Sequence, residues 1–286
     1  MNVVLITGCS SGFGLVSALA FARRGDRVYA SMRNLSKAGD LKAVIEAERL
    51  PITPLQLDVT DDESVKQAVL HVLKSEGRID VLVNNAGMGC LGPVEFLSDD
   101  MLRSVFETNF FGVVRMLRAV LPTMREQNSG VVVNVSSIDG RIPGRPINWA
   151  YSSTKHSLGV LSDALALEVE SFGIKVRLIE PGFFATKISD NRVVWESRVS
   201  EDRREMECID SPYRTLEEAV KSSATKNMAK AADPQIVADA IVEAANEKSP
   251  FPVHYPVGDD AVAALKEIDL YDEEEQATAW KRMVGL

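Results

Sequence analysis

Short apolar runs alternate with longer amphipathic segments from residue 3 to residue 179, and this alternation constrains the fold more than any other feature. Runs of strand length, rich in β-branched residues, occur at 3–7, 27–31, 53–58, 81–84, 131–135 and 175–179. Helical patterns lie between them at 13–24, 61–76, 98–126 and 151–171. The first run has no polar alternation, as expected for a strand that helices cover on both faces. The pattern predicts a doubly wound α/β fold with a parallel sheet.

No repeat or low-complexity linker interrupts this pattern, so we expect one domain over residues 1–286. After the sixth strand, residues 187–230 are polar and charged, with helical fragments but no clear strand. A helical insertion at this place is typical of a lid over a substrate, and a pair of solvated surface helices explains it about equally well. A helix at 234–247, a short strand at 253–255 and an acidic tail complete the chain.

Composition excludes several classes of protein. The net charge of -9 disfavours a nucleic-acid partner, because phosphate binding needs a basic surface. The sequence contains no apolar run long enough for a membrane span, and its first residues resemble a strand rather than a signal peptide. We expect a cytoplasmic protein without a metal site, since the few cysteines and histidines are scattered: Cys9, Cys90, Cys208, His71, His156 and His254.

The segment TGCSSGFG, residues 7–14, follows the first strand and opens the first helix. Its glycines permit positive φ angles and a close approach of ligand to backbone, and the helix N-terminus favours a phosphate. The spacing GxxxGxG is only moderately specific, and a tight turn that binds nothing is the alternative. The position after the first strand favours nucleotide binding, with these predicted contacts: Gly8, Ser10, Ser11, Gly12, Phe13 and Gly14.

Two further segments are expected beside this loop, because the carboxyl ends of parallel strands share one edge of the sheet. In LDVTD, Asp58 ends the third strand and Val59 follows it, so that the carboxylate can meet an adenine edge. In VNNAG, the fourth strand is followed by amide and small side chains. Asn84 and Asn85 also suit a plain turn, but together with the glycine loop the segment predicts cofactor contacts at Asn85, Ala86 and Gly87.

The second strand indicates which nicotinamide cofactor the chain prefers. An acidic residue at its end would bind the ribose 2′-hydroxyl of NAD, but this strand ends in Met32 and Arg33. A guanidinium suits a 2′-phosphate, and a charged hydrogen bond of this kind contributes roughly 1.5–3 kcal/mol. We therefore expect NADP(H) in preference to NAD(H), although an exposed arginine after a strand is also common.

Tyr151 and Lys155 lie four residues apart in AYSSTKH, so a helix puts them on the same face. A phenol has an unperturbed pKa of about 10, and lowering it toward ~7 needs roughly 4 kcal/mol of phenolate stabilisation. A nearby ammonium can supply much of this in a dry pocket. The pair alone is weak evidence because the same spacing arises by chance in many helices.

The motifs together are more specific. TGCSSGFG, NNAG, Asn109 in TNFFG, Ser136-Ser137 in NVSSIDG, the YSSTK segment and EPG resemble the short-chain dehydrogenase/reductase family in its compact, single-domain branch. The resemblance covers residues 1–187 densely and implies a Rossmann-like fold. More narrowly, RVYASMRN and LDVTDDESV are similar to NADP-dependent 17β-hydroxysteroid and retinol dehydrogenase relatives.

The resemblance implies roles for individual residues. Tyr151 would give the proton in carbonyl reduction and take it in alcohol oxidation, while Lys155 would lower its pKa and hold the nicotinamide ribose. Ser137 would bind the substrate oxygen and Asn109 would order a water-linked proton path. Tyr151 follows Ser137 by 14 positions, one more than is usual in the family, so Ser136 is an alternative. Further implied cofactor contacts are Tyr151, Lys155, Pro181, Gly182 and Thr186.

The function expected from these residues is NADP(H)-dependent hydride transfer to or from a bulky apolar ketone or secondary alcohol, for which steroids and retinoids are candidates. A catalytically silent NADP(H)-sensing regulator and a sugar epimerase or dehydratase are the alternatives. The family suggests a homodimer or homotetramer formed through two long helices. Residues expected to line an apolar substrate pocket, with packing as an equal explanation, are Cys90, Trp149, Phe183, Phe184 and Trp195.

Overall fold

The structure, a computed structural model, describes residues 1–142, 144–186, 193–194, 212–228 and 231–268. Its centre is a seven-stranded sheet in the order β3-β2-β1-β4-β6-β7-β9, and every neighbouring pair of strands is parallel. The strands are β1 (Val3–Ile6), β2 (Arg27–Met32), β3 (Ile52–Gln56), β4 (Val81–Asn84), β6 (Gly130–Val135), β7 (Ile174–Pro181) and β9 (His254–Val257).

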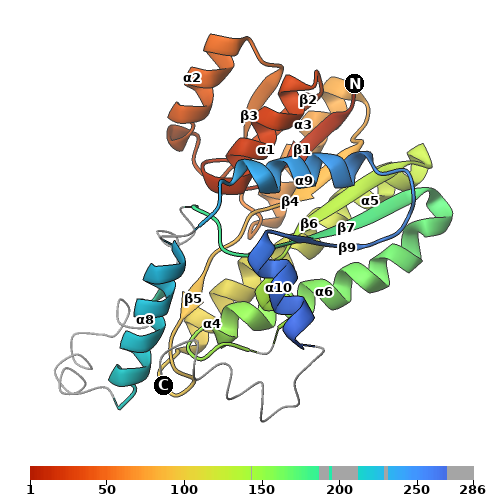
Figure 1. The fold of residues 1–286 in the computed structure, drawn as a ribbon. Coiled ribbons are helices and arrows are strands. Elements are labelled where there is room, and N and C mark those ends of the chain that lie inside the picture. The colour runs from red at the N-terminus through yellow and green to blue at the C-terminus, as the bar shows by residue number, and fades with distance from the viewer. Residues whose placement is uncertain (143, 187–192, 195–211, 229–230, 269–286) are drawn as a thin grey trace.

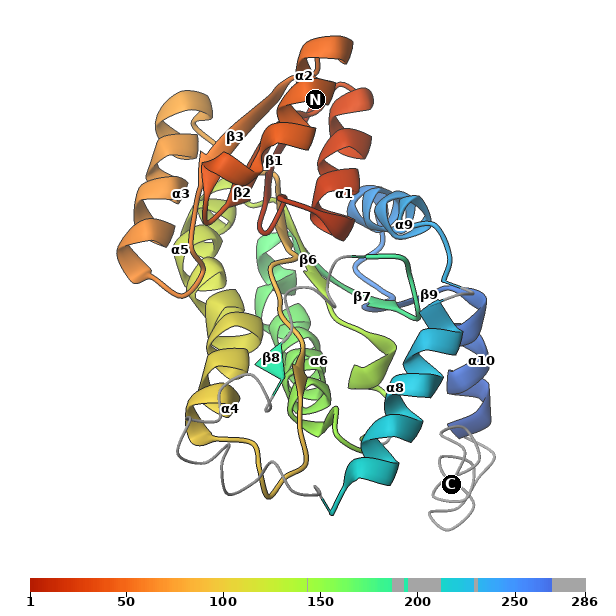
Figure 2. The same cartoon turned by 90° about the vertical axis from the view of Figure 1, so that its left-hand side faces the viewer.

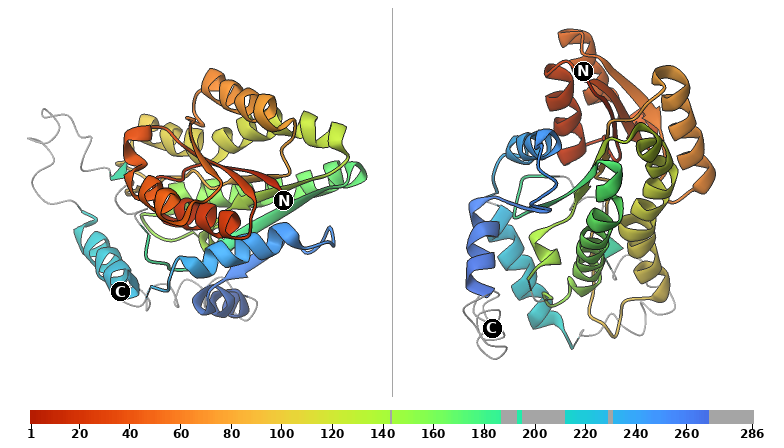
Figure 3. Two further views of the ribbon diagram at one scale, coloured as in Figure 1. Left: turned by 90° about the horizontal axis from the view of Figure 1, so that it is seen from above. Right: turned by 90° about the vertical axis from the view of Figure 1, so that its right-hand side faces the viewer.

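Helices cover both faces of the sheet (Figures 1 and 2). One layer contains α3 (Asp62–Glu76), α5 (Gly112–Gln127) and α6 (Trp149–Val169), and the other contains α1 (Gly12–Arg23), α2 (Gly39–Glu48) and α9 (Gln235–Asn246). Viewed from above, the sheet lies between these two layers (Figure 3). The remaining long helices are α4 (Asp99–Phe106), α8 (Arg214–Met228) and α10 (Asp259–Ile268). Of the helices described, none is both long and apolar enough to cross a membrane.

Each layer of helices closes its own hydrophobic core, and the alternating sides of the strands contribute to both. Leu5 of β1 packs on the α3–α5–α6 side, while Val4 and Ile6 pack on the α1–α9 side. All four residues of β1 are buried. The absence of polar alternation in this strand is therefore explained by burial on both faces.

The doubly wound parallel sheet predicted from the sequence is confirmed. The predicted long helix over 98–126 is interrupted by a π-helical turn, η2 (Glu107–Phe111), between α4 and α5. Helices α2 and α10 were not predicted.

The expectation of no strand within 187–230 was wrong. Strand β8 (Val193–Val194) pairs in parallel with β5 (Cys90–Leu91) in a separate two-stranded sheet. Two residues are too few to produce a periodic signal, and the pairing links positions far apart in the chain. The predicted helical piece VSEDRREME at 199–207 lies outside the described residues, whereas LEEAVKSSATKN lies in α8.

Arg177 of β7 is fully buried and holds the end of α9 on the sheet. Its Nε atom donates to the Ala244 carbonyl oxygen at 3.0 Å, and its Nη1 atom donates to Pro250 at 2.7 Å. Nη2 donates to the carbonyl oxygens of Glu247 and Ser249. One buried guanidinium thus binds carbonyl groups at the C-terminus of a helix and in the loop after it, and so joins both to β7.

We expect Arg177→Met to lower the free energy of unfolding by about 3 kcal/mol or more, because the hydrogen bonds that join the end of α9 and the loop after it to β7 are lost together. Chemical denaturation of the purified protein measures the change. Arg23→Met is the matched control: Arg23 pairs with Glu48 on the surface, and its loss should cost less than about 1 kcal/mol. Equal losses in the two variants would contradict the role of Arg177.

Candidate active site

The glycine loop joins β1 to α1 in a conformation that side chains would block. Gly8 and Gly12 have φ angles of +74° and +56°, in the left-handed region. A Cβ atom on Gly8 would lie 2.9 Å from the Ala86 Cα atom, and one on Gly14 would lie 2.5 Å from the Gly8 oxygen. Among the described side chains, none caps the N-terminus of α1. Its first N–H groups therefore remain available to an anion.

Asn85 holds this loop against the end of β4. Its Nδ2 atom donates to the carbonyl oxygens of Thr7 at 2.8 Å and Gly8 at 3.2 Å. In return, the Thr7 hydroxyl oxygen accepts the main-chain N–H groups of Asn85 and Ala86, both at 3.0 Å. The NNAG segment therefore does more than turn the chain: it fixes two strand ends and the glycine loop as one unit.

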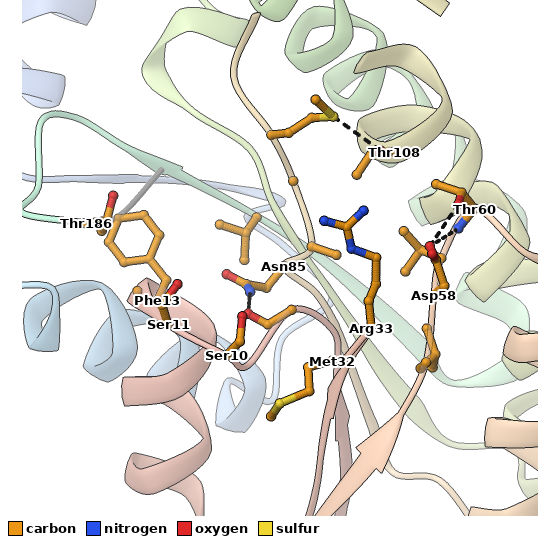
Figure 4. A pocket seen from close by; sticks show the side chains of 18 of the residues that line it. Ser10, Ser11, Phe13, Met32, Arg33, Asp58, Thr60, Asn85, Thr108 and Thr186 are labelled. Carbon is orange, nitrogen blue, oxygen red and sulfur yellow. Dashed lines mark hydrogen bonds between the residues drawn. The ribbon is translucent and has the colours of Figure 1, made fainter. Parts of the chain in front are cut away.

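A pocket of about 650 Å³ opens at these strand ends (Figure 4). The predicted cofactor contacts that line it are Gly8, Ser10, Ser11, Gly12, Phe13, Arg33, Asp58, Val59, Asn85, Ala86, Gly87, Tyr151, Lys155 and Thr186. Gly14, Pro181 and Gly182 are not among the lining residues. Gly14 lies beneath the loop, and Gly182 lies against the Asp260 carboxylate, where a Cβ atom would clash.

Sequence reasoning missed several lining residues. Figure 4 shows the Arg33 side chain pointing into the pocket, with Asp58 and Thr60 to one side. Lys37, at the end of the 3₁₀ turn η1 (Leu35–Lys37), brings a second cation to the same end. A basic residue one turn after Arg33 was the available signal. Other missed lining residues are Met32, Asn34, Leu57, Thr60, Met88, Thr108 and Val135, while Ser136, the alternative to Ser137, also lines the pocket.

Asp58 lines the pocket, as predicted. The prediction that it ends a strand was wrong, since β3 ends at Gln56. Its Oδ1 atom accepts hydrogen bonds from the Thr60 N–H at 3.0 Å and the Thr60 hydroxyl at 2.8 Å. This local turn draws the chain out of the strand before Asp58.

Asn109 lies in the π-helical turn and is 1% exposed. Its Oδ1 atom accepts the Met88 N–H, and its Nδ2 atom donates to the Met88 carbonyl oxygen and to the Thr154 hydroxyl, at 2.9, 2.9 and 3.1 Å. A Cβ atom on Gly87 would lie 3.4 Å from Asn109 Oδ1 and 3.9 Å from Lys155 Nζ. The Asn109 and Lys155 side chains therefore converge on the space that Gly87 leaves.

Tyr151 and Lys155 lie on one face of α6, and both are buried. The Lys155 Nζ atom is 5.6 Å from the centre of the Tyr151 ring and donates to the Val135 carbonyl oxygen at 2.8 Å. The Ser137 hydroxyl lies near the Tyr151 phenol and lowers the pKa of that phenol. The Ser136 hydroxyl instead donates to the Lys155 carbonyl oxygen at 3.4 Å. Of the two serines, Ser137 acts on the phenol, whereas Ser136 is the one that lines the pocket.

The electrostatics differ from the expectation. Burial raises the pKa of the Tyr151 phenol and the Asp139 carboxylate raises it further, while the Ser137 hydroxyl and the Arg145 guanidinium lower it. Burial also lowers the pKa of Lys155 to about 8. The phenol pKa is thus displaced upward, opposite to the predicted direction. The free-energy penalty of ionising a buried phenol exceeds the stabilisation of the phenolate by its neighbours.

Among the described residues, those expected to line an apolar substrate pocket lie in different environments and do not form one cluster. Cys90 and Phe184 are buried in hydrophobic clusters. The Trp149 indole donates to the Gly92 carbonyl oxygen at 3.0 Å, and the Phe183 ring lies under Arg145. Packing accounts for Cys90 and Phe184, and Trp195 lies outside the described residues.

Comparison with known proteins finds relatives that match about two thirds of the chain. The 3-ketodihydrosphingosine reductase of Bacteroides thetaiotaomicron is 42% identical over 196 residues, which are 68% of each chain. Retinol dehydrogenase 8 of Bos taurus is 44% identical over 190 residues, 65% of this chain and 60% of the relative. The chain thus matches under two thirds of the length of the bovine relative.

Solved structures extend the similarity to nearly the whole chain. A short-chain dehydrogenase from Streptomyces avermitilis matches with a TM-score of 0.81 and 35% identity, over 98% of this chain and 96% of the other. ElxO with NADP bound matches with a TM-score of 0.73 and 27% identity, over 92% and 100%. The family model for short chain dehydrogenases matches residues 2–197. The chain belongs to the short-chain dehydrogenase family and is an NAD(P)-dependent oxidoreductase.

Proposed function

We propose that the protein uses NADP(H) to reduce a bulky apolar ketone, or to oxidise the corresponding secondary alcohol. The observation that carries the proposal is the pair of Tyr151 and Lys155 in the lining of the pocket at the glycine loop, with the Ser137 hydroxyl near the phenol. The names of two relatives refer to retinol and 3-ketodihydrosphingosine, which are both long and largely apolar. This likeness supports an apolar substrate.

The pocket residues fit a dinucleotide. The glycine loop leaves space against its backbone, and the uncapped N-terminus of α1 suits the pyrophosphate. Arg33 and Lys37 would hold a 2′-phosphate, with Asp58 and Val59 at the adenine. Lys155 would hold the nicotinamide ribose, and Thr186, near Gly12, would contact the cofactor from the other side. When bound, NADPH supplies the hydride.

The proton transfer follows from the state of the phenol. Its raised pKa keeps Tyr151 neutral, which is the form that donates a proton to a developing alkoxide. Ser137 would donate a hydrogen bond to the substrate oxygen and orient it toward Tyr151. Lys155 would put a positive charge behind the phenol as it loses the proton, and Asn109, bonded to Thr154, would fix this part of α6.

The other expectations extend this proposal. We propose that part of 187–230 covers the substrate, which the bond from Tyr213 to Glu95 and the packing of Tyr213 on Phe96 support. The whole of 1–286 would act as one domain, as a homodimer or homotetramer. The buried free thiols of Cys9 and Cys90 suit the reducing cytoplasm.

Tyr151→Phe should abolish ketone reduction and leave NADPH affinity nearly unchanged, because only the proton donor is lost. The measurements are NADPH oxidation with a panel of steroid, retinoid and long-chain ketones, and fluorescence titration of NADPH. Ser137→Ala should lose more activity than Ser136→Ala. Substantial turnover by Tyr151→Phe would contradict the mechanism, and tight NADPH binding by a wild-type chain that reduces no ketone would favour the sensing regulator.

Arg33→Ala should weaken NADPH binding by roughly ten- to a hundredfold, with little effect on NADH, because only NADPH carries the 2′-phosphate. Lys37→Ala should act in the same direction. Both affinities are measured by the same fluorescence titration. Arg24→Ala, an exposed arginine at the end of α1, is the control. Equal losses for the two cofactors would refute the preference for NADP(H).

Lys155→Met should stabilise the cofactor-free protein by about 1–3 kcal/mol near neutral pH while it impairs turnover. Because the folded-state pKa of Lys155 is about 8, below the ordinary lysine value of 10.5, the unfolded chain binds more protons between these values. Wild-type stability therefore rises with pH across this interval, and the advantage of the variant should shrink there. Denaturant unfolding at several pH values tests this, and a less stable variant at neutral pH would contradict it.

A further inference from the structure

Asp139 is a buried carboxylate beside the candidate active site to which the proposed mechanism gives no role. It lies in the 3₁₀ turn η3 (Ile138–Gly140), directly after Ser137, and is 8% exposed. Its N–H donates to the Ser137 hydroxyl oxygen at 3.2 Å. Its Oδ2 atom accepts a hydrogen bond from Asn148 Nδ2 at 2.9 Å, and its Oδ1 atom lies 3.0 Å from Arg145 Nε.

The turn that carries Asp139 is held on two sides. A Cβ atom on Gly140 would lie 2.8 Å from the Lys155 carbonyl oxygen and 3.0 Å from the Ser136 hydroxyl, so the turn packs directly on α6. On its other side, Ile138 and Ile142 pack with Ala261 of α10. Movement of the turn would therefore disturb both packings.

Asp139 also links the two halves of the site. Through its main chain it contacts Ser137, two residues after β6, and through its side chain it contacts Asn148, the residue that precedes α6. Helix α6 carries Tyr151 and Lys155. The Asp139–Asn148 bond thus closes the segment between Ser137 and Tyr151.

We propose that Asp139 is a positioning residue for the proposed reaction. It fixes Ser137 relative to the start of α6 and puts a negative charge beside the Tyr151 phenol, with Arg145 as its counter-ion. The proposal rests on the proposed function, since it assigns the proton transfer to Tyr151. Asp139 itself touches neither substrate nor cofactor in this account.

The charges that face the phenol determine the direction in which each variant should shift the pKa of Tyr151. They come from Asp139 on η3, Arg145 in the following loop and Lys155 on α6. Asp139 raises the pKa of Tyr151 and Arg145 lowers it. Removal of the carboxylate should ease phenolate formation, whereas removal of the guanidinium should oppose it. Structural damage alone would not shift the pKa of the Tyr151 phenol in opposite directions in the two variants.

The test is a pH titration of Tyr151 in the NADP⁺-saturated protein. Near-ultraviolet difference spectra between each protein and its Tyr151→Phe counterpart isolate the tyrosinate signal of this residue. Asp139→Asn keeps an oxygen for Asn148 and should move the onset of the signal to lower pH by about half a unit, a threefold change in proton concentration. Arg145→Gln should move it to higher pH, and the double variant should return toward wild type.

Asp80→Asn is the matched control, because Asp80 is also a buried carboxylate paired with an arginine, Arg78. The exposed fractions of the Asp80 and Asp139 side chains are 11% and 12%. Asp80 lies before β4, at the opposite end of the strands from the pocket, and its loss should leave the onset unchanged.

Displacement of the onset in the same direction by Asp139→Asn and Arg145→Gln, or no displacement by either, would overturn the proposal. If Asp139→Asn does not fold, Arg145→Gln decides alone, and an onset at or below the wild-type pH overturns it. The titration needs no substrate. A chain that reduces no ketone therefore refutes the proposed function, while the outcome for Asp139 is read separately.

Discussion

The hydrogen bonds between Thr7 and the Asn85–Ala86 segment join the ends of β1 and β4, and the pocket depends on this junction. Parallel pairing brings the carboxyl ends of the strands to one edge, but it does not by itself make a cradle. The junction brings the Ala86 backbone against Gly8, where no Cβ atom fits, and leaves the first N–H groups of α1 available. Strand pairing, glycine placement and anion binding are thus consequences of one arrangement.

A second constraint comes from burial of polar chemistry at the same edge. Lys155 and Tyr151 lie where ionisation is costly, so the pKa values of both are displaced toward the neutral forms. Buried ionisable groups lower the stability of the folded state. They suit proton transfer, because small changes in neighbouring charge shift their protonation. The pair of Asp139 and Arg145, with its opposite effects on the phenol, fits this view of the site.

The sequence was sufficient for the parallel α/β architecture, because a strand buried on both faces leaves an unmistakable apolar run and the helices between strands have clear periodicity. Most predicted pocket residues follow from strand ends and glycines. The phenol pKa could not be predicted in sign, since it depends on burial and on Asp139, whose proximity is a product of folding. Strand β8 was missed because two residues carry no period, and Lys37 because its turn had not been recognised.

The π-helical turn at Glu107–Phe111 changes the orientation of α5 relative to α4. A π-helical turn accommodates one residue more than an α-helical turn, so α5 starts with its faces rotated relative to α4. This extra residue directs Asn109 toward Met88 and Thr154. A deletion in this segment would therefore turn Asn109 away from both partners even though its side chain is kept.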